Sequence, residues 1–384
     1  MLATESSAHE TATRYSRCLL LVTKTVVRYI IQADTAFSFC VRTGVSPAIC
    51  PESEMMSEPN KTLDRLTSNM RTKALAIVGA LLAGGCATAH RPGAFAPLMP
   101  ASSGIVATSL TCTGLNADCF CRPSGKPRRA LILLGGSEGG KSWSSQTRQI
   151  EQLVDAGYYV LSVAYFRAEG LPSDLRAIPL EYFAEVFRWL SVQKGVVPDD
   201  YVVMGVSRGA ELALLLASVY PQVKAVVAIA PSSVVFPGPP TGILDALRGQ
   251  HSAWSLAGQE VPFLPIPYSL ATLQGLVSGR RTRMFEKALS NAHGVEKAAI
   301  RAEKARGPIL LISFTRDQIW PSTLMAEQLT RRLAANGFGF ECQHHAYARK
   351  HSDWSFEPCW TCIVAFLSRQ CETRAEHSVP GGAG

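Results

Sequence analysis

Charged residues are scarce in this sequence. Lys, Arg, Asp and Glu supply 18% of the 384 positions, whereas apolar residues supply 47%. This balance excludes an intrinsically disordered chain and predicts a globular protein. No internal repeat is present. The roughly 240 residues between Arg129 and Leu367 suit one α/β domain with a substantial core.

Motifs for nucleotide and nucleic-acid binding are also missing. The glycine-rich stretch at residues 135–140 lacks the Gly-Lys-Ser/Thr ending of a phosphate-binding loop. The net charge is +8, but the cations are dispersed except at residues 279–283 and 297–306. We therefore expect no nucleic-acid partner, because a solvated face is the usual role of such dispersed charges.

Cysteine, by contrast, is abundant, with eleven copies. Most of those in the globular region fall into two groups: Cys112, Cys119 and Cys121, and Cys359, Cys362 and Cys371. Their spacing is not the usual paired spacing of a zinc site, so no metal is expected. In an oxidising compartment these cysteines would form disulfides.

A Gly-x-Ser-x-Gly pentapeptide, Gly-Val-Ser-Arg-Gly, occupies residues 205–209. An apolar run of strand type precedes it at residues 201–204, and strong helix formers follow at residues 210–217. A strand, a tight turn and a helix in this order are the context of a nucleophile elbow, in which glycine leaves room for a strained backbone. Ser207 is therefore the predicted nucleophile. The alternative is a buried serine near a helix N-terminus.

An acid and a histidine follow in the chain order of hydrolase triads, which is serine, acid, histidine. Asp317 lies just past a buried-strand pattern, where a parallel sheet gathers functional groups. A helix is expected at residues 322–336, with Ser322 as its cap. His351 lies in the loop after the next predicted strand, residues 340–347.

Other residues compete for these two roles. The competing histidines lie in the predicted strand or in a long insertion: His344, His345, His251 and His293. An aspartate after a strand can also be only a helix cap or a surface charge. Asp353 is so close to His351 in sequence that it is poorly placed to orient the His351 ring from the side opposite the nucleophile. The favoured assignment is Asp317 as the acid and His351 as the base.

Serine attack on an acyl group also requires backbone N–H donors that point at the developing oxyanion. One donor should be the N–H of Arg208, the residue after the nucleophile. The other is expected from the glycine-rich loop at residues 135–140, which follows a predicted strand at residues 129–134. We assign this second donor to Ser137 or a neighbour.

Predicted strands and helices alternate through residues 129–371. This alternation predicts an α/β-hydrolase fold, in which a mainly parallel sheet is covered by helices on both faces. The stretch at residues 236–306 interrupts the alternation. Its aromatic residues, including Trp254, Phe263 and Tyr268, suggest a cap that defines an acyl pocket over the cleft.

Several segments together resemble a known family. They are residues 133–140, 205–213, 230–233, 252–254 and 317–322. They look like parts of the C-terminal catalytic domain of acyl-CoA thioesterases and bile acid-CoA:amino acid N-acyltransferases, over about residues 129–367. The resemblance implies a triad of Ser207, Asp317 and His351. Members with a cysteine nucleophile transfer acyl groups to amines, whereas serine members are mostly hydrolytic, so serine here favours hydrolysis.

Two loops depart from the family's pattern and are more basic than the resemblance implies. Phe-Thr-Arg stands at residues 314–316, where the family usually has Gly and a second acidic residue, and Ala-Arg-Lys stands at residues 348–350 in place of glycines. The family also has an N-terminal immunoglobulin-like domain, which the resemblance would place before residue 129. The 42 residues between Cys86 and Arg129 are too few for such a domain and suffice only for a strand pair. The clusters at 279–283 and 297–306 could meet an anionic substrate tail, such as the phosphates of coenzyme A.

A second signal precedes the globular region. Residues 70–73 are a short basic segment, residues 74–83 are a ten-residue apolar run, and Gly-Gly-Cys86 follows. This layout predicts a secretory signal that is too short for a membrane span. Small residues ahead of Cys86 resemble the lipobox of bacterial lipoproteins, so we expect lipidation at Cys86 and export. A cytoplasmic enzyme with a chance apolar run is the alternative.

The expected domains follow from these signals. They are an upstream extension that is untranslated or disordered at residues 1–69, a signal peptide at 70–85, a short segment at 86–128, the catalytic domain at 129–371 and a flexible tail at 372–384. The predicted protein is a serine hydrolase that cleaves an acyl thioester or ester of a small molecule through an acyl-enzyme, without a cofactor. An exported carboxylesterase or acyltransferase and a non-catalytic acyl-binding lipoprotein are the alternatives.

Overall fold

The computed structural model describes residues 104–111, 114–123, 125–240, 245, 249–267 and 281–377. The expected signal segment at residues 70–85 and the lipid site at Cys86 lie outside the described residues, and so does Tyr268. Within the described part, no helix combines the length and the apolar character that crossing a membrane requires.

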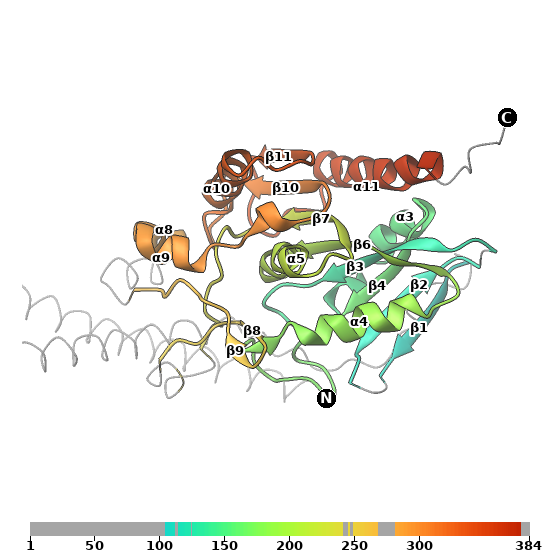
Figure 1. The fold of residues 1–384 in the computed structure, drawn as a ribbon, viewed down its shortest axis with the longest axis horizontal. Coiled ribbons are helices and arrows are strands. Elements are labelled where there is room, and N and C mark those ends of the chain that lie inside the picture. Colours follow the sequence, from blue (N-terminus) through green and yellow to red (C-terminus); the bar gives the residue numbers. More distant parts are fainter. Residues whose placement is uncertain are drawn as a thin grey trace, which may run out of the picture. The chain divides into compact units, whose positions relative to one another are not determined.

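An eight-stranded sheet organises the described residues (Figure 1). In spatial order its strands are β1 Val106–Leu110, β2 Ala117–Cys121, β4 Tyr159–Val163, β3 Arg128–Leu134, β6 Val196–Val206, β7 Val223–Ile229, β10 Ile309–Phe314 and β11 Cys342–Tyr347. Neighbouring strands pair in parallel from β4 to β11, whereas β1 and β2 join the β4 edge in antiparallel fashion. The sheet is therefore mainly parallel, as predicted.

Side chains of the central strands enter two hydrophobic cores in alternation. In β3, Ala130 and Ile132 belong to one core, and Leu131 and Leu133 belong to the other. The reason is that successive side chains leave a strand on opposite faces. Because both faces are buried, the strand sequence is apolar at nearly every position.

Helices cover both faces of the sheet (Figure 1). One core includes side chains of α4 Glu181–Ser191, α5 Arg208–Val219 and α10 Ser322–Ala335, and the other includes side chains of α3 Thr147–Asp155 and α11 Glu357–His377. A mainly parallel sheet covered in this way confirms the predicted α/β-hydrolase fold.

The structure moves several predicted boundaries. β1 and β2 belong to the main sheet, so the sheet begins before the expected domain boundary at residue 129. α11 continues to His377, beyond the expected end at residue 371. A 3₁₀ turn, η3 Ser142–Ser145, directly precedes α3.

The insertion at residues 236–306 is partly described. It contains β8 Trp254–Leu256, β9 Gln259–Glu260, α8 Thr282–Leu289, α9 Ala292–Ala298 and η4 Ala302–Lys304, and β8 also pairs with β5 Ile178–Pro179. Trp254 does not line a pocket, because its side chain is fully buried in the core that includes α4, α5 and α10. Its ring centroid lies 5.7 Å from that of Tyr165. Phe263 is partly buried against the same core. The prediction that Trp254 defines an acyl pocket is wrong: this residue anchors the insertion to the domain.

The expected disulfides are absent among the described cysteines, and Cys112 lies outside the described residues. Cys119 hydrogen-bonds the Tyr159 hydroxyl within the sheet, and Cys359, in α11, is buried in the core. Burial raises the pKa of both Cys119 and Cys359 to about 12. Each thiol is therefore held in its protonated form, which is a poor nucleophile for disulfide exchange.

Two glycines let α5 approach the sheet closely. A Cβ atom at Gly209 would lie 2.4 Å from the carbonyl oxygens of Leu134 and Gly135. A Cβ at Gly205 would lie 2.0 Å from the Gly209 carbonyl oxygen. A Cβ atom essentially never comes within 3.0 Å of a non-bonded heavy atom, so any larger residue at these positions would push helix and strand apart.

We expect Gly209→Ala to lower the free energy of unfolding by at least about 2 kcal/mol, because the obstructing atoms belong to the backbone and have little freedom to move. Gly195→Ala is the matched control, since its Cβ would lie 3.8 Å from the Tyr159 ring, an ordinary contact. Urea denaturation of both variants measures the difference. Equal denaturation midpoints would contradict the close packing of α5 on β3.

Candidate active site

Ser207 lies at the turn between β6 and α5 in a strained backbone conformation. Its φ is 58° and its ψ is −116°, a combination that residues with a side chain rarely adopt. The Ser207 N–H donates to the Ile229 carbonyl at the end of β7, with an N···O distance of 2.8 Å. Strand, strained serine and helix thus follow one another as the pentapeptide predicted.

Asp317 is held in place by four hydrogen bonds. Oδ1 accepts the backbone N–H groups of Ile319 at 2.9 Å and Trp320 at 3.2 Å. Oδ2 accepts the Ser322 hydroxyl at 2.8 Å and pairs with His351 Nδ1 at 2.7 Å. The side chain is only 2% exposed, so this network replaces water around the carboxylate.

Ser322 contributes to this network in a way that the sequence did not reveal. It was expected to cap α10, but the N-cap is Pro321 and Ser322 is the first helical residue. Its hydroxyl donates to Asp317 and accepts the Phe314 N–H at 3.2 Å. The expected cap is therefore wrong, and Ser322 instead fastens the acid to the end of β10.

Asp317 contacts His351 and none of the competing histidines that the structure describes. His344 Nε2 lies 2.8 Å from the Ser313 hydroxyl, and burial lowers its pKa. His251 Nδ1 lies 2.7 Å from a carboxylate oxygen of Glu260. Because His351 meets the acid through Nδ1, its Nε2 is the nitrogen left to exchange a proton.

The loop after β3 lies directly against the nucleophile. A Cβ at Gly136 would lie 3.3 Å from the Ser207 Cβ. The Gly136 N–H donates to a Glu138 carboxylate oxygen at 2.7 Å. Within the described residues the next N–H, that of Ser137, has no assigned acceptor, which suits the predicted oxyanion donor.

Tyr165 supports this loop from the core. Its hydroxyl donates to the Gly135 carbonyl at 2.6 Å, and complete burial raises the pKa of Tyr165 well above its usual value. The hydroxyl therefore remains a donor across the physiological pH range. Neither role is predicted from the sequence, because Tyr165 belongs to no motif and Glu138 enters only as part of the glycine-rich loop.

The side chain of Arg208 connects the elbow with two other segments. Its guanidinium donates to Glu211 at 3.0 Å and to the Pro237 carbonyl at 2.6 Å, and it lies over the Trp320 ring, 5.5 Å from the centroid. The Trp254 indole N–H donates to Glu211 at 2.7 Å. Burial raises the pKa of the Glu211 carboxyl, and the neighbouring Arg208 and Trp254 offset part of that rise.

This buried pair also locates the other predicted oxyanion donor. Arg208 is the first residue of α5, where backbone N–H groups have no partner inside the helix. With its side chain fixed by Glu211 and Pro237, the Arg208 N–H is held beside Ser207. Removing one member of a buried charged pair typically costs about 3–5 kcal/mol, so the elbow depends on both.

An apolar cluster borders His351. The Trp320 ring meets the His351 ring edge-on, with 6.0 Å between centroids, and Phe236 and Phe285 pack around Trp320. These residues and their neighbours form a hydrophobic cluster separate from the two main cores. The side chain that packs against the base is therefore Trp320, which this cluster holds in place.

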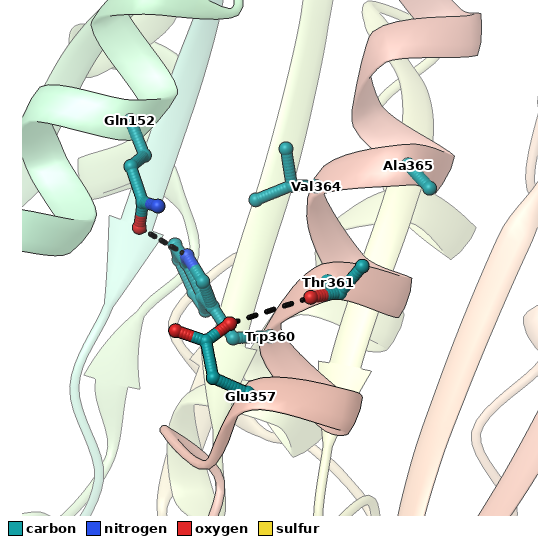
Figure 2. A pocket seen from close by; sticks show the side chains of 6 residues that line it. All are labelled: Gln152, Glu357, Trp360, Thr361, Val364 and Ala365. Atoms are coloured by element: carbon teal, nitrogen blue, oxygen red, sulfur yellow. Dashed lines mark hydrogen bonds between the residues drawn. The ribbon is translucent and has the colours of Figure 1, made fainter.

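Figure 2 shows a hollow elsewhere on the domain, beside α3 and α11. Its lining residues are Gln152, Glu357, Trp360, Thr361, Val364 and Ala365. The Trp360 indole N–H donates to Gln152 at 2.7 Å. Since no predicted site residue is among these six, the hollow is not the candidate active site.

Comparison with known proteins agrees with the motifs. Residues 178–351 match the family described as BAAT / Acyl-CoA thioester hydrolase C terminal. Acyl-coenzyme A amino acid N-acyltransferase 1 of Mus musculus is 30% identical over 222 residues, 57% of this chain and 47% of that protein. Acyl-coenzyme A thioesterase 6 of Homo sapiens is 27% identical over 244 residues, 59% of this chain and 54% of that protein.

The chain thus spans about half the length of these relatives. A solved structure, a truncated carbohydrate esterase from gut microbiota, is similar with a TM-score of 0.47 and 14% identity, over 71% of this chain and 99% of the other. The family match coincides with the part of the chain that carries Ser207, Asp317 and His351. Over residues 178–351 this chain is therefore similar to the C-terminal domain of the bile acid-CoA:amino acid N-acyltransferase and acyl-CoA thioester hydrolase family.

Proposed function

We propose that this chain is a serine hydrolase that cleaves an acyl thioester or ester through an acyl-enzyme on Ser207. The 2.7 Å contact between Asp317 and His351 Nδ1 carries the proposal. An acid that holds histidine by Nδ1 fixes the tautomer whose Nε2 takes the nucleophile's proton. The strained elbow at Ser207 and the loop at Gly136 supply the other two parts of such a site.

Each residue has a defined part in the mechanism. His351 Nε2 accepts the proton as Ser207 Oγ attacks the acyl carbon, and Asp317 stabilises the imidazolium that forms. The N–H groups of Arg208 and Ser137 stabilise the oxyanion. The tetrahedral intermediate expels the thiolate or alkoxide, which takes the proton from His351. Water, activated by His351, then attacks the acyl-enzyme and releases the carboxylic acid.

An acyl-CoA thioester is the leading substrate class, because the relatives are named as acyl-CoA thioesterases and acyl-CoA N-acyltransferases. Serine at position 207 favours water over an amine as the acceptor, by the resemblance described above. An acyltransferase remains the second candidate.

A fluorophosphonate probe tests the nucleophile. We expect it to label the native protein and not Ser207→Ala, because the probe reacts with an activated serine. His351→Ala should lower kcat by about 10³–10⁴-fold, as loss of a triad member does in other hydrolases. His344→Ala is the matched control, since His344 pairs with Ser313 instead of Asp317.

The outcomes separate an enzyme from a non-catalytic acyl-binding protein. Equal labelling of native protein and Ser207→Ala, or no labelling of either, would rule out the triad. A large loss of kcat in His344→Ala with none in His351→Ala would transfer the role of base to His344.

We also propose that the protein is exported and lipidated at Cys86, on the strength of the basic segment, the apolar run and Gly-Gly-Cys at residues 70–86. Mass spectrometry of the protein purified from its native membranes should find an acylated Cys86 at the N-terminus. Cys86→Ser should release the protein from membranes. Detection of peptides that span residues 70–86 in the mature protein would contradict this proposal.

A further inference from the structure

The two loops that carry the acid and the base also carry cations at the adjacent positions. Arg316 precedes Asp317, and Lys350 precedes His351. The loops run side by side, because the Thr315 N–H donates to the Tyr347 carbonyl at 2.9 Å and the Arg316 N–H donates to the Arg349 carbonyl at 3.2 Å. Positive charge is therefore gathered at the rim of the proposed triad.

These cations are not neutralised within the described residues. Arg316, Arg349 and Lys350 are exposed and form no ion pair there. The Asp317 carboxylate is already occupied by four hydrogen bonds, one of them from His351. The remaining acid of the loop, Asp353, accepts the backbone N–H of Lys350 at 3.3 Å.

The basic cluster at residues 297–306 is partly paired with acids. At residues 297–306, Arg301 pairs with Glu296 at 2.7 Å, and Arg332 joins Glu296 and Glu303 at 3.2 and 2.8 Å. Of the cations at 297–306, Arg301 is thus paired with an acid, whereas Lys297, Lys304 and Arg306 are exposed and form no ion pair within the described residues. The rim cations differ from these in their place, because Arg316 and Lys350 directly precede the acid and the base in the chain.

One of the rim cations is also oriented. The Arg349 guanidinium lies over the Phe356 ring, 4.8 Å from its centroid. Such stacking uses one face of the guanidinium and leaves its in-plane N–H groups available to an acceptor. The Arg281 N–H donates to the Gln318 carbonyl at 3.0 Å, so Arg281 also borders the loop that carries Asp317.

We propose that Arg316, Arg349 and Lys350 bind phosphate on the leaving group, so that the enzyme prefers acyl substrates with a phosphorylated leaving group. Guanidinium and ammonium groups are the usual partners of phosphate oxygens. Nucleotide phosphates of coenzyme A and the phosphate of an acylated glycerol phosphate both have this chemistry. The inference rests on the proposed hydrolase function.

Three substrates with one acyl chain test the inference: the acyl-CoA thioester, the uncharged N-acetylcysteamine thioester and the acyl ester of glycerol 3-phosphate. Arg316→Gln/Lys350→Gln should lower kcat/KM for a phosphorylated substrate about tenfold more than for the uncharged thioester, mainly through KM. Raising the NaCl concentration should also reduce the native enzyme's preference for a phosphorylated substrate over the uncharged thioester. The phosphorylated substrate that shows the selective loss identifies the source of the phosphate.

Arg188→Gln/Arg331→Gln is the matched control, because it removes two exposed helix cations distant in sequence from the triad loops. It should leave the ratio of the kcat/KM values unchanged. An equal loss on all three substrates in Arg316→Gln/Lys350→Gln, or no loss, would overturn the inference and leave the hydrolase intact.

Failure of the hydrolase itself has a different signature. If no substrate is hydrolysed in a Ser207-dependent manner, the proposed function fails. Calorimetric titration of coenzyme A into Ser207→Ala then still decides the phosphate site, because it needs no turnover. Binding that is lost on adding Arg316→Gln/Lys350→Gln supports the site, and binding insensitive to these changes, or no binding, contradicts it.

Discussion

The carboxylate of Asp317 is the point on which the site depends. Its four hydrogen bonds join its own loop, the first residue of α10 and the His351 loop. Because the side chain is buried, every bond that is lost leaves an acceptor without water to replace the donor. The position of the base is therefore set by the start of α10 as much as by the loop that carries His351.

A second constraint holds the nucleophile. Ser207 has a backbone conformation that costs on the order of 1–3 kcal/mol, and the surrounding packing has to compensate for it. Gly205 and Gly209 allow α5 to press against β6 and β3, and Arg208 ties the helix to Pro237 and Glu211. The same guanidinium lies over the Trp320 ring, and the backbone N–H of Trp320 donates to Asp317. Elbow and acid loop thus share one buried network.

Local patterns in the sequence predicted the elbow, α5 and the pairing of Asp317 with His351, because each depends on residues close in the chain or on the fixed order of strands. The role of Ser322 and the burial of Trp254 were predicted wrongly. Ser322 prefers the Asp317 carboxylate five residues earlier to a capping bond, and Trp254 finds its acceptor on Glu211, 43 positions away. Contacts of this kind depend on tertiary packing and leave no signal in local sequence.

In the proposed mechanism, every turnover passes through an acyl group on Ser207. Trypsin cleaves after Lys194 and Arg208, and Ser207 is the only serine of residues 195–208. Rapid acid quenching of the enzyme during turnover of an acyl thioester, followed by peptide mass spectrometry, locates the acyl group. We expect the mass of the acyl group on Ser207, at a level that rises when His351-dependent deacylation is slowed. An acyl group on another residue, or turnover at full rate with Ser207 never acylated, would contradict it.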